Sequence, residues 1–239
     1  MPPSSPIIGG QNAEEGEFKY IVSLRLQADP NTHGGAGSLI SDRWILTARH
    51  TLMESVLDSR TRKVRFTLAY SVTAAPQYYN DMRKFVNLTK YDAEKTFCHP
   101  VPDFPGPSSV LDGDIGLMKL KKAIPLGSQS PYNFQTIPMI KNPSEVNWND
   151  PVKLAGWGQY RIGIPGASNF LLKTDIETYL FDTCENVIPL FRKDLEFCAY
   201  EFGKSACFLD SGGPGVFKKI GTSNFILAGI ISYGIENCT

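Results

Sequence analysis

The sequence predicts an all-β protein built from two halves of about five strands each, and three observations support this fold class. Short apolar or alternating runs recur along the chain, separated by Gly, Pro, Asn and Asp. Helical periodicity is almost absent, and only residues 187–193 are expected to form a short helix. With 239 residues and a hydrophobic content of 42%, the chain can bury a full core.

The first half is expected to contain five strands, each bounded by turn residues. They are residues 20–26, 37–41, 44–48, 64–70 and 114–120. A stretch with several prolines, residues 71–113, separates the fourth strand from the fifth. We expect it to form one or several surface loops.

Five more strands are expected in the second half, after a connection over residues 121–151. They are residues 152–159, 171–179, 196–200, 215–219 and 225–234. The last one contains FILAGIIS, the longest apolar run of the chain, which is far shorter than the roughly 20 residues of a membrane helix. It is better interpreted as a buried strand, and no membrane partner is predicted.

Charge and residue spacing exclude several classes of function. The 24 basic and 24 acidic side chains give a net charge of zero, so no basic field favours nucleic acid or an anionic membrane. No CxxC pair or histidine spacing suits zinc, and no loop collects Asp and Glu at calcium-ligand spacing. We therefore expect no metal and no cofactor.

The cysteines indicate an oxidising compartment. Five are present, at positions 98, 184, 198, 207 and 238, and disulfides explain them better than a metal site does. Sequons at Asn87 and Asn237 are compatible with secretion. Residues 1–6 lack the charged and apolar parts of a signal peptide, so either the chain begins after the signal or its start is missing. The expected location is extracellular.

Only three histidines can serve as a general base, His33, His50 and His99. A nucleophilic serine usually needs such a base, because a free hydroxyl is almost never ionised at neutral pH. His50 follows an apolar strand directly, where a scaffold would present it. His33 lies in a probable turn and His99 in the long loop; each histidine taken alone is most simply a surface residue.

An aspartate and a serine complete a candidate constellation. Asp114 opens DIGLMKL, where it would by itself be a turn residue before a strand. Ser211 lies in DSGGP, on what looks like a tight turn. The chain order His50, Asp114, Ser211 differs from the orders of subtilisin-like enzymes and α/β-hydrolases. The hydrolase elbow also needs glycine two residues before the serine, where Leu209 stands.

Six segments in order make the chain resemble the chymotrypsin/trypsin family of serine peptidases. They are IIGG (7–10), GGAGSLISDRWILTARH (34–50), DIGLMKL (114–120), GWGQ (156–159), DSGGP (210–214) and ISYG (231–234). The resemblance implies two antiparallel six-stranded Greek-key β-barrels with the active site between them.

The resemblance also divides the chain. It implies that residues 1–6 are a propeptide remnant and 7–239 the peptidase domain. The N-terminal barrel would span about 20–120 and the C-terminal barrel about 150–239. The family continues beyond the position of Thr239 with another strand and a helix, so the second barrel is expected to be truncated.

Catalytic roles follow from the same resemblance. Ser211 resembles the nucleophile, His50 the general base and Asp114 the carboxylate that orients it. The N–H groups of Leu209 and Ser211 resemble the oxyanion hole. Ile7 resembles the new N-terminus that activation of a zymogen creates, and Asp210 the buried aspartate that its ammonium group pairs with.

The resemblance places the substrate pocket at four positions. Ser205 would lie at its base, and Ser232 would support Asp114 and bind substrate backbone. Tyr233 and Gly234 would form the pocket wall. A neutral base and an open wall favour aromatic or apolar side chains, which is a chymotrypsin-like preference.

Two disulfides are implied by the family frame, Cys184–Cys198 and Cys207–Cys238. Two other common bridges are lost at both ends: Gly35 and Thr51 replace one pair, and Val152 and Phe217 the other. Cys98 is left over as a free or intermolecular thiol.

Three more departures bear on activity. Leu209 replaces a glycine, and a positive φ there would cost leucine about 1–2 kcal/mol. Pro6 precedes Ile7, so a trypsin-like activator would not cut there. Arg49 replaces an alanine beside His50, where a close, buried cation would disfavour the imidazolium.

The expected function is a secreted serine endopeptidase that forms an acyl-enzyme without a cofactor. The expected partners are polypeptide substrates and protein inhibitors of proteases, and the expected state is a monomer. The alternative is a catalytically weak or inactive homologue that acts as a binding or regulatory module. An unrelated β-barrel binding protein is a third and weaker hypothesis.

Overall fold

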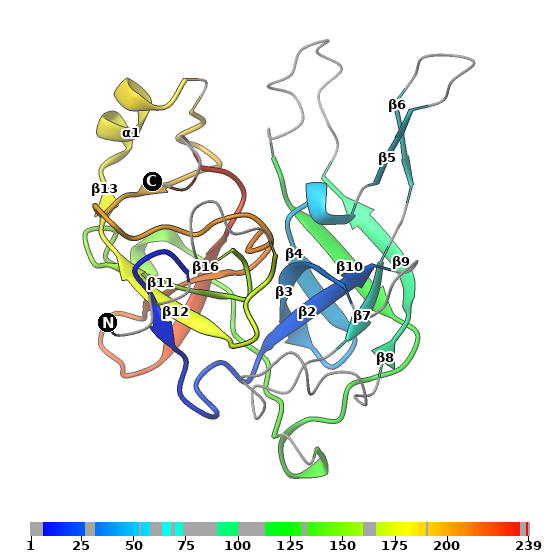
Figure 1. Cartoon of the computed structure of the whole chain (residues 1–239). Helices are drawn as coiled ribbons and strands as arrows, with labels where there is room; N and C mark the ends of the chain where they lie inside the picture. Colours follow the sequence, from blue (N-terminus) through cyan, green and yellow to red (C-terminus); the bar gives the residue numbers. More distant parts are fainter. Residues whose placement is uncertain are drawn as a thin grey trace, which may run out of the picture.

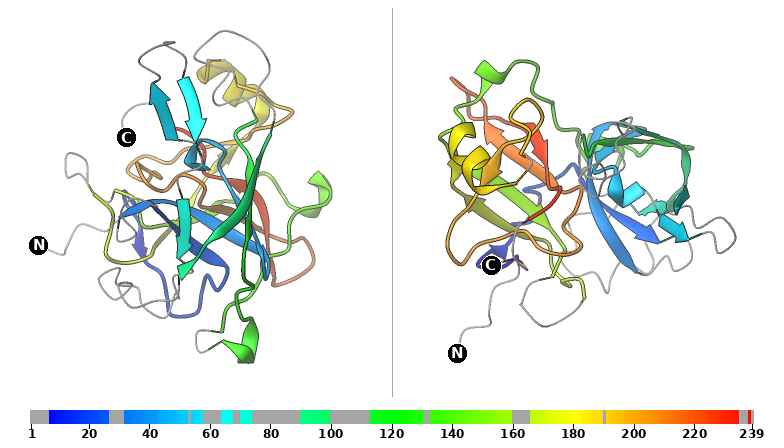
Figure 2. Two further views of the ribbon diagram at one scale, coloured as in Figure 1. Left: turned by 90° about the vertical axis from the view of Figure 1, so that its right-hand side faces the viewer. Right: turned by 90° about the horizontal axis from the view of Figure 1, so that it is seen from above.

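The computed structural model describes two antiparallel sheets that lie side by side (Figure 1). The described residues are 7–26, 32–52, 54–57, 64–67, 70–73, 90–99, 113–130, 133–159, 166–189, 191–234 and 238. Seen from above, the blue, cyan and green first half stands beside the yellow and orange second half (Figure 2). The prediction of an all-β protein with two halves is confirmed.

The first sheet has seven strands in the order β8-β7-β2-β3-β4-β10-β9. Their bounds are β2 Ile21–Leu26, β3 His33–Ser41, β4 Trp44–Thr47, β7 Tyr70–Thr73, β8 Lys90–Tyr91, β9 Ala93–Cys98 and β10 Gly116–Leu120. A separate hairpin pairs β5 (Glu54–Leu57) with β6 (Val64–Thr67). Apolar residues of β2, β3, β4 and β10 share one buried cluster, and in β10 the buried positions alternate along the strand, as its period of two predicts.

The second sheet has five strands in the order β1-β12-β11-β15-β16. Their bounds are β1 Gln11–Asn12, β11 Val152–Gly156, β12 Leu172–Ile176, β15 Pro214–Lys218 and β16 Phe225–Ile230. A small hairpin of β13 (Thr178–Tyr179) and β14 (Cys198–Ala199) flanks the helix α1 (Phe181–Val187). Because β1 pairs with β12, the start of the described chain belongs to the second half.

The apolar core is continuous between the halves. The larger cluster joins residues of the first sheet to Trp157, Leu171, Val216 and Leu227 of the second half. A smaller cluster in the second half contains Val152 and Phe217, which are 0% and 1% exposed. Val152 and Phe217 stand where the family resemblance implies a disulfide. The structure therefore has two apolar side chains of one buried cluster at this place.

Two expectations for secondary structure are corrected. Residues 71–113 are not all loop, because β8 and β9 lie in this stretch and β9 pairs with β10 from Gly116 to Leu120. β8 and β9 are partly exposed strands at the two edges of the sheet, and neither has a continuous apolar run to reveal it. Residues 100–112 lie outside the described part.

The helix is also shifted from its expected place. It runs over Phe181–Val187, and Ile188 already has extended backbone with φ −109° and ψ 109°. Pro189 follows, and a proline disfavours the helical conformation of the residue before it. The helix therefore ends where it was expected to begin.

Candidate active site

His50 is presented at the end of β4. The strand ends at Thr47, and His50 opens a short 3-10 turn, His50–Leu52. Buried hydroxyl groups fix this turn, because Thr47 Oγ1 donates to Ala36 O at 2.7 Å and Thr51 Oγ1 donates to Ala48 O at 2.7 Å. The His50 side chain is 29% exposed, so one side of the ring faces solvent.

Asp114 holds His50 through both carboxylate oxygens. His50 Nδ1 lies 2.6 Å from Asp114 Oδ2, and the His50 backbone N–H donates to Oδ1 at 2.8 Å. Ser232 Oγ donates to Oδ2 at 2.5 Å. With Nδ1–H donating to the carboxylate, His50 Nε2 is left as the proton acceptor.

The carboxylate of Asp114 is ionised in this setting. Burial by itself would raise the pKa of Asp114, and its side chain is only 2% exposed. The hydrogen bonds from His50 and Ser232 outweigh burial and hold the pKa below its usual value. A fixed negative charge therefore orients the imidazole.

Ser211 lies on a turn that packs against the strands leading to His50. Ser211 O accepts a hydrogen bond from Ala36 N in β3 at 2.9 Å. Gly212 has φ 80°, and a Cβ there would lie 2.0 Å from Thr47 Oγ1 and 3.0 Å from Ala48 N. Only glycine permits this approach, and the contact brings the serine turn against the end of β4.

Residues Gly35 and Thr51 lie at the same junction. A Cβ on Gly35 would lie 3.0 Å from Ser211 O and 3.1 Å from Thr51 Cγ2. The two positions that replace the other lost bridge are therefore neighbours, with a buried threonine side chain filling the space.

The family model described as Trypsin matches residues 7–239. The chain belongs to the trypsin family. Among curated relatives, Hypodermin-A from Hypoderma lineatum is 25% identical over 233 residues, which cover 96% of this chain and 78% of that protein. Lectizyme from Glossina austeni is 28% identical over 248 residues, covering 99% of this chain and 79% of that protein.

A solved structure shows the same fold. Mouse neuropsin, described as a serine protease expressed in the limbic system of the brain, superimposes with a TM-score of 0.74 at 21% identity. The match covers 96% of this chain and 88% of that one. This similarity shows that the two proteins share their fold.

Leu209 has left-handed backbone, with φ 74°. The structure thus meets the condition under which leucine is strained at this position. Within the described ranges, the N–H groups of Asp210, Gly212 and Gly213 have backbone acceptors, whereas those of Leu209 and Ser211 have none. Two neighbouring donors on one turn are left for an external acceptor.

His33 is the site residue that sequence reasoning missed. It is 3% exposed in β3 rather than in a surface turn. Its Nε2 donates to Leu209 O at 3.0 Å, and its Nδ1 lies 2.7 Å from Ser23 Oγ. Burial and the charge of Arg25 lower the pKa of His33 to about 3, against the opposing effect of the Leu209 bond. A neutral histidine therefore fixes the peptide at Leu209.

Asp210 is a buried carboxylate whose only described hydrogen-bond donors are two backbone N–H groups. Cys207 N donates to Oδ2 at 2.9 Å and Gly158 N to Oδ1 at 2.7 Å. No cation contacts it within the described residues, and burial raises its pKa to about 7 despite these bonds. Ile7 is also fully buried, and Ile8 O accepts from Ser205 N at 3.0 Å. The N-terminal segment thus pairs with Ser205, which precedes the Asp210 turn in the chain.

The expected pocket residues occupy two adjoining segments. Ser205 is partly buried and its Oγ donates to Ala206 O at 2.6 Å. Ser232, Tyr233 and Gly234 follow β16, and a Cβ on Gly234 would meet no atom within 4 Å. The predicted disulfides are both present, with Cα–Cα distances of 5.9 Å for Cys184–Cys198 and 5.2 Å for Cys207–Cys238.

Arg49 and Cys98 also have defined places. Arg49 is 1% exposed and its Nη1 donates to His99 O at 3.2 Å, so the cation beside His50 is interior. Cys98 is a partly buried free thiol in β9, and burial raises its pKa against the effect of Arg49. His99 itself is exposed.

No group of three or more His, Cys, Asp or Glu side chains in the described part of the chain is arranged to hold a metal ion. No helix among these residues has the length and apolar character to cross a membrane.

Proposed function

We propose that this member of the trypsin family is a serine endopeptidase that cleaves polypeptides through Ser211, His50 and Asp114. The observation that carries the proposal is the hydrogen-bonded series Ser232–Asp114–His50, together with the Ser211 turn packed on β3 and β4. A buried, ionised carboxylate that fixes the imidazole tautomer is what general-base activation of a serine requires.

The proposed reaction has two halves. Ser211 Oγ attacks the scissile carbonyl carbon while its proton passes to His50 Nε2. The amine leaves with that proton, and an ester on Ser211 remains. Water then attacks the ester with His50 again accepting a proton, and the acid product leaves as Ser211 recovers its hydrogen.

The negative oxygen of each tetrahedral intermediate needs donors that are already in place. The N–H groups of Leu209 and Ser211 are the proposed oxyanion hole, supported by their lack of acceptors within the described residues. The His33 bond to Leu209 O supports the required peptide orientation.

Activation and specificity are proposed by the same family reasoning. A freed Ile7 ammonium would provide the cation that buried Asp210 lacks among the described residues, which favours a zymogen that is cut before Ile7. The neutral Ser205 and open Gly234 favour an aromatic or apolar side chain at the cleavage site. We further propose that the enzyme is secreted, as the two disulfides favour, that it acts as a monomer and that protein inhibitors bind it.

A catalytically weak or inactive homologue is the second candidate, and the strained φ of Leu209 is the observation that favours it. Reaction with a fluorophosphonate separates the two. We expect one adduct on Ser211 after maturation at Ile7, and no adduct on the Ser211→Ala variant, with both measured by intact mass. A folded, mature protein that takes no adduct would support the binding module.

A further inference from the structure

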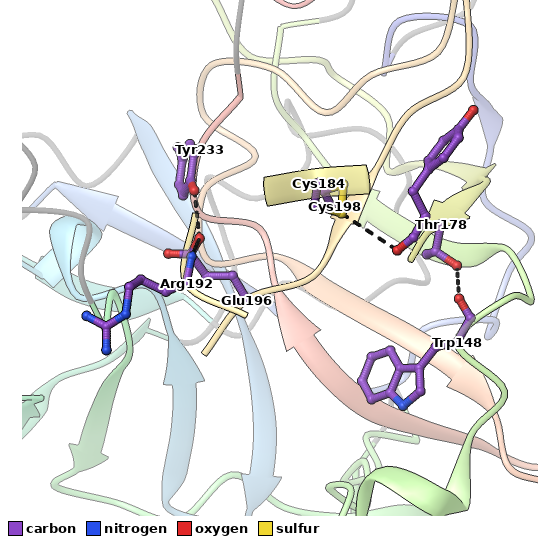
Figure 3. Close-up of a disulfide and its surroundings, with 8 residues drawn as sticks. Trp148, Thr178, Cys184, Arg192, Glu196, Cys198 and Tyr233 are labelled. Carbon is purple, nitrogen blue, oxygen red and sulfur yellow. Dashed lines mark hydrogen bonds between the residues drawn. A yellow bond between two sulfur atoms is a disulfide. The ribbon is translucent and has the colours of Figure 1, made fainter. Parts of the chain in front are cut away.

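The loop between α1 and β14 makes a specific contact with the proposed substrate-binding edge. Tyr233 Oη donates to Glu196 Oε2 at 2.7 Å, and the backbone N–H of Arg192 donates to the same oxygen at 3.2 Å (Figure 3). These two partners of Glu196 come from segments 37 and 4 residues away in sequence. Oε2 of Glu196 thus joins this loop to Tyr233, which follows β16 in the chain.

The loop that carries Glu196 is fixed at both ends and within itself. The Cys184–Cys198 bridge joins buried Cys184 of α1 to the start of β14, two residues after Glu196. The N–H of Glu196 donates to Arg192 O at 2.7 Å, which closes a turn. The carboxylate is therefore positioned before any ligand arrives.

The guanidinium group of Arg192 is directed to a different carboxylate. Its Nε and Nη2 contact Asp194 at 3.2 and 3.1 Å. Glu196 forms no ion pair with a described residue and is hydrogen-bonded by uncharged donors. Asp194 thus offers a matched control, because it lies in the same loop and does not contact Tyr233.

Tyr233 connects this loop to the catalytic group. It directly follows Ser232, whose hydroxyl donates to Asp114, and its own side chain is 38% exposed. Burial and the Glu196 carboxylate raise the pKa of Tyr233, so the phenol remains a hydrogen-bond donor throughout the working range of pH. Without the Glu196 carboxylate as its acceptor, the Tyr233 ring would be free to rotate beside the backbone of residues 232–234.

We propose that Glu196 is a positioning residue for substrate binding, which holds the Tyr233 ring so that residues 232–234 can receive an extended polypeptide. This inference rests on the proposed endopeptidase function. A ring that is already held loses less conformational freedom on binding, so the contact should act on substrate affinity more than on the chemical step. The Glu196–Tyr233 contact should also affect only the binding of substrates that are long enough to lie along residues 232–234.

Substrates of two lengths test this role. The long one is the best of a panel of tetrapeptide anilides, and the short one is an ester of the same terminal amino acid. Glu196→Ala and Tyr233→Phe should each raise KM for the tetrapeptide about five- to tenfold. Glu196→Ala, which lies outside the proposed pocket, should keep kcat within about twofold and leave the short ester nearly unchanged. The double variant should resemble either single variant, because both remove the same contact.

Two further variants distinguish positioning from a general structural effect. Glu196→Gln keeps an oxygen acceptor and should restore KM to within about twofold of the unaltered chain. Asp194→Ala should leave both substrates unaffected. Equal losses for long and short substrates in Glu196→Ala, additive losses in the double variant, or an unchanged KM in Tyr233→Phe would overturn the inference.

Failure of the endopeptidase proposal can be recognised separately. If the mature, unaltered chain takes no fluorophosphonate, the panel of tetrapeptides is titrated calorimetrically against the unaltered chain, and the tightest binder is then titrated against each variant. An affinity about fivefold lower in both Glu196→Ala and Tyr233→Phe would still support Glu196 as a positioning residue. Absence of peptide binding to the unaltered chain would refute both proposals.

Discussion

Leu209 carries a conformational cost at the centre of the proposed oxyanion hole. Its φ of 74° lies in the region where an L-residue loses about 1–2 kcal/mol relative to the right-handed conformation. The surrounding turn outweighs this cost, because His33 holds the carbonyl of Leu209 and Asp210 is anchored by Cys207 and Gly158. The N–H that catalysis would use is retained, since only proline lacks one.

Comparing glycine with alanine at this position isolates the backbone cost. We expect Leu209→Gly to be more stable than Leu209→Ala by about 0.5–1 kcal/mol. Glycine removes the strain of the positive φ, and this gain exceeds the additional conformational entropy that glycine loses on folding. Urea unfolding of the two variants measures this difference. An alanine variant at least as stable as the glycine variant would mean that the turn does not demand a positive φ.

At the scale of elements, the end of β11 and the serine turn are packed without spare volume. A Cβ on Gly158 would lie 2.4 Å from Cγ of Asp210 and 2.5 Å from its Oδ2. A Cβ on Gly156 would lie 2.1 Å from Oδ1 of the same residue. Gly158 is required because its backbone N–H donates to the buried carboxylate, and Gly156 is required because the carboxylate lies directly against its backbone.

We expect Gly158→Ala to destabilise the fold by more than about 2 kcal/mol, because neither the strand end nor the buried carboxylate can move cheaply. The fluorophosphonate reaction should slow as the turn is displaced. Gly215→Ala in neighbouring β15 is the control, since its Cβ would meet only ordinary contacts at 3.4 Å. Urea unfolding and labelling rates are measured for both; equal effects would contradict the proposed contact.

Across the molecule, a buried histidine of the first half and a buried aspartate of the second half give the stability opposite pH dependences. His33 of the first half bonds the turn that contains Asp210 of the second. The folded pKa of His33, about 3, is below its unfolded value, so its contribution to stability is lost as the pH falls below about 6.5. The folded pKa of Asp210, about 7, is above its unfolded value, so its contribution is lost as the pH rises from about 4 to 7.

In the chain that retains residues 1–6, the variant Asp210→Asn separates the pH dependence due to Asp210 from the one due to His33. Between pH 4 and 7 the unaltered chain should lose stability relative to Asp210→Asn as the pH rises, because ionising the buried carboxylate favours unfolding. Urea unfolding at several pH values gives the difference. After cleavage before Ile7, pairing with the new ammonium should weaken this dependence. A constant difference between the two uncut chains would show that Asp210 does not titrate in the folded state.

Much of the fold was predictable because strand signals are local. Eight of the expected strands overlap closely with β2, β3, β4, β10, β11, β12, β15 and β16, where apolar residues recur between turn residues. Weak local signals account for the misses: β9 is an edge strand with charged residues, and α1 is a seven-residue helix with one buried residue, Cys184. The assignment of His50, Asp114 and Ser211 as catalytic residues stays a prediction.

Strand signals in the sequence were enough to predict the fold class, and the order of six short segments was enough to reveal the family resemblance, which implied the two cysteine pairs. The folded structure was needed to show that His33 is buried against Leu209, that Leu209 has a positive φ, and that Glu196 accepts from Tyr233. Burial, backbone angle and contact between distant segments depend on how the two sheets and their loops pack. No local pattern of residues specifies that packing.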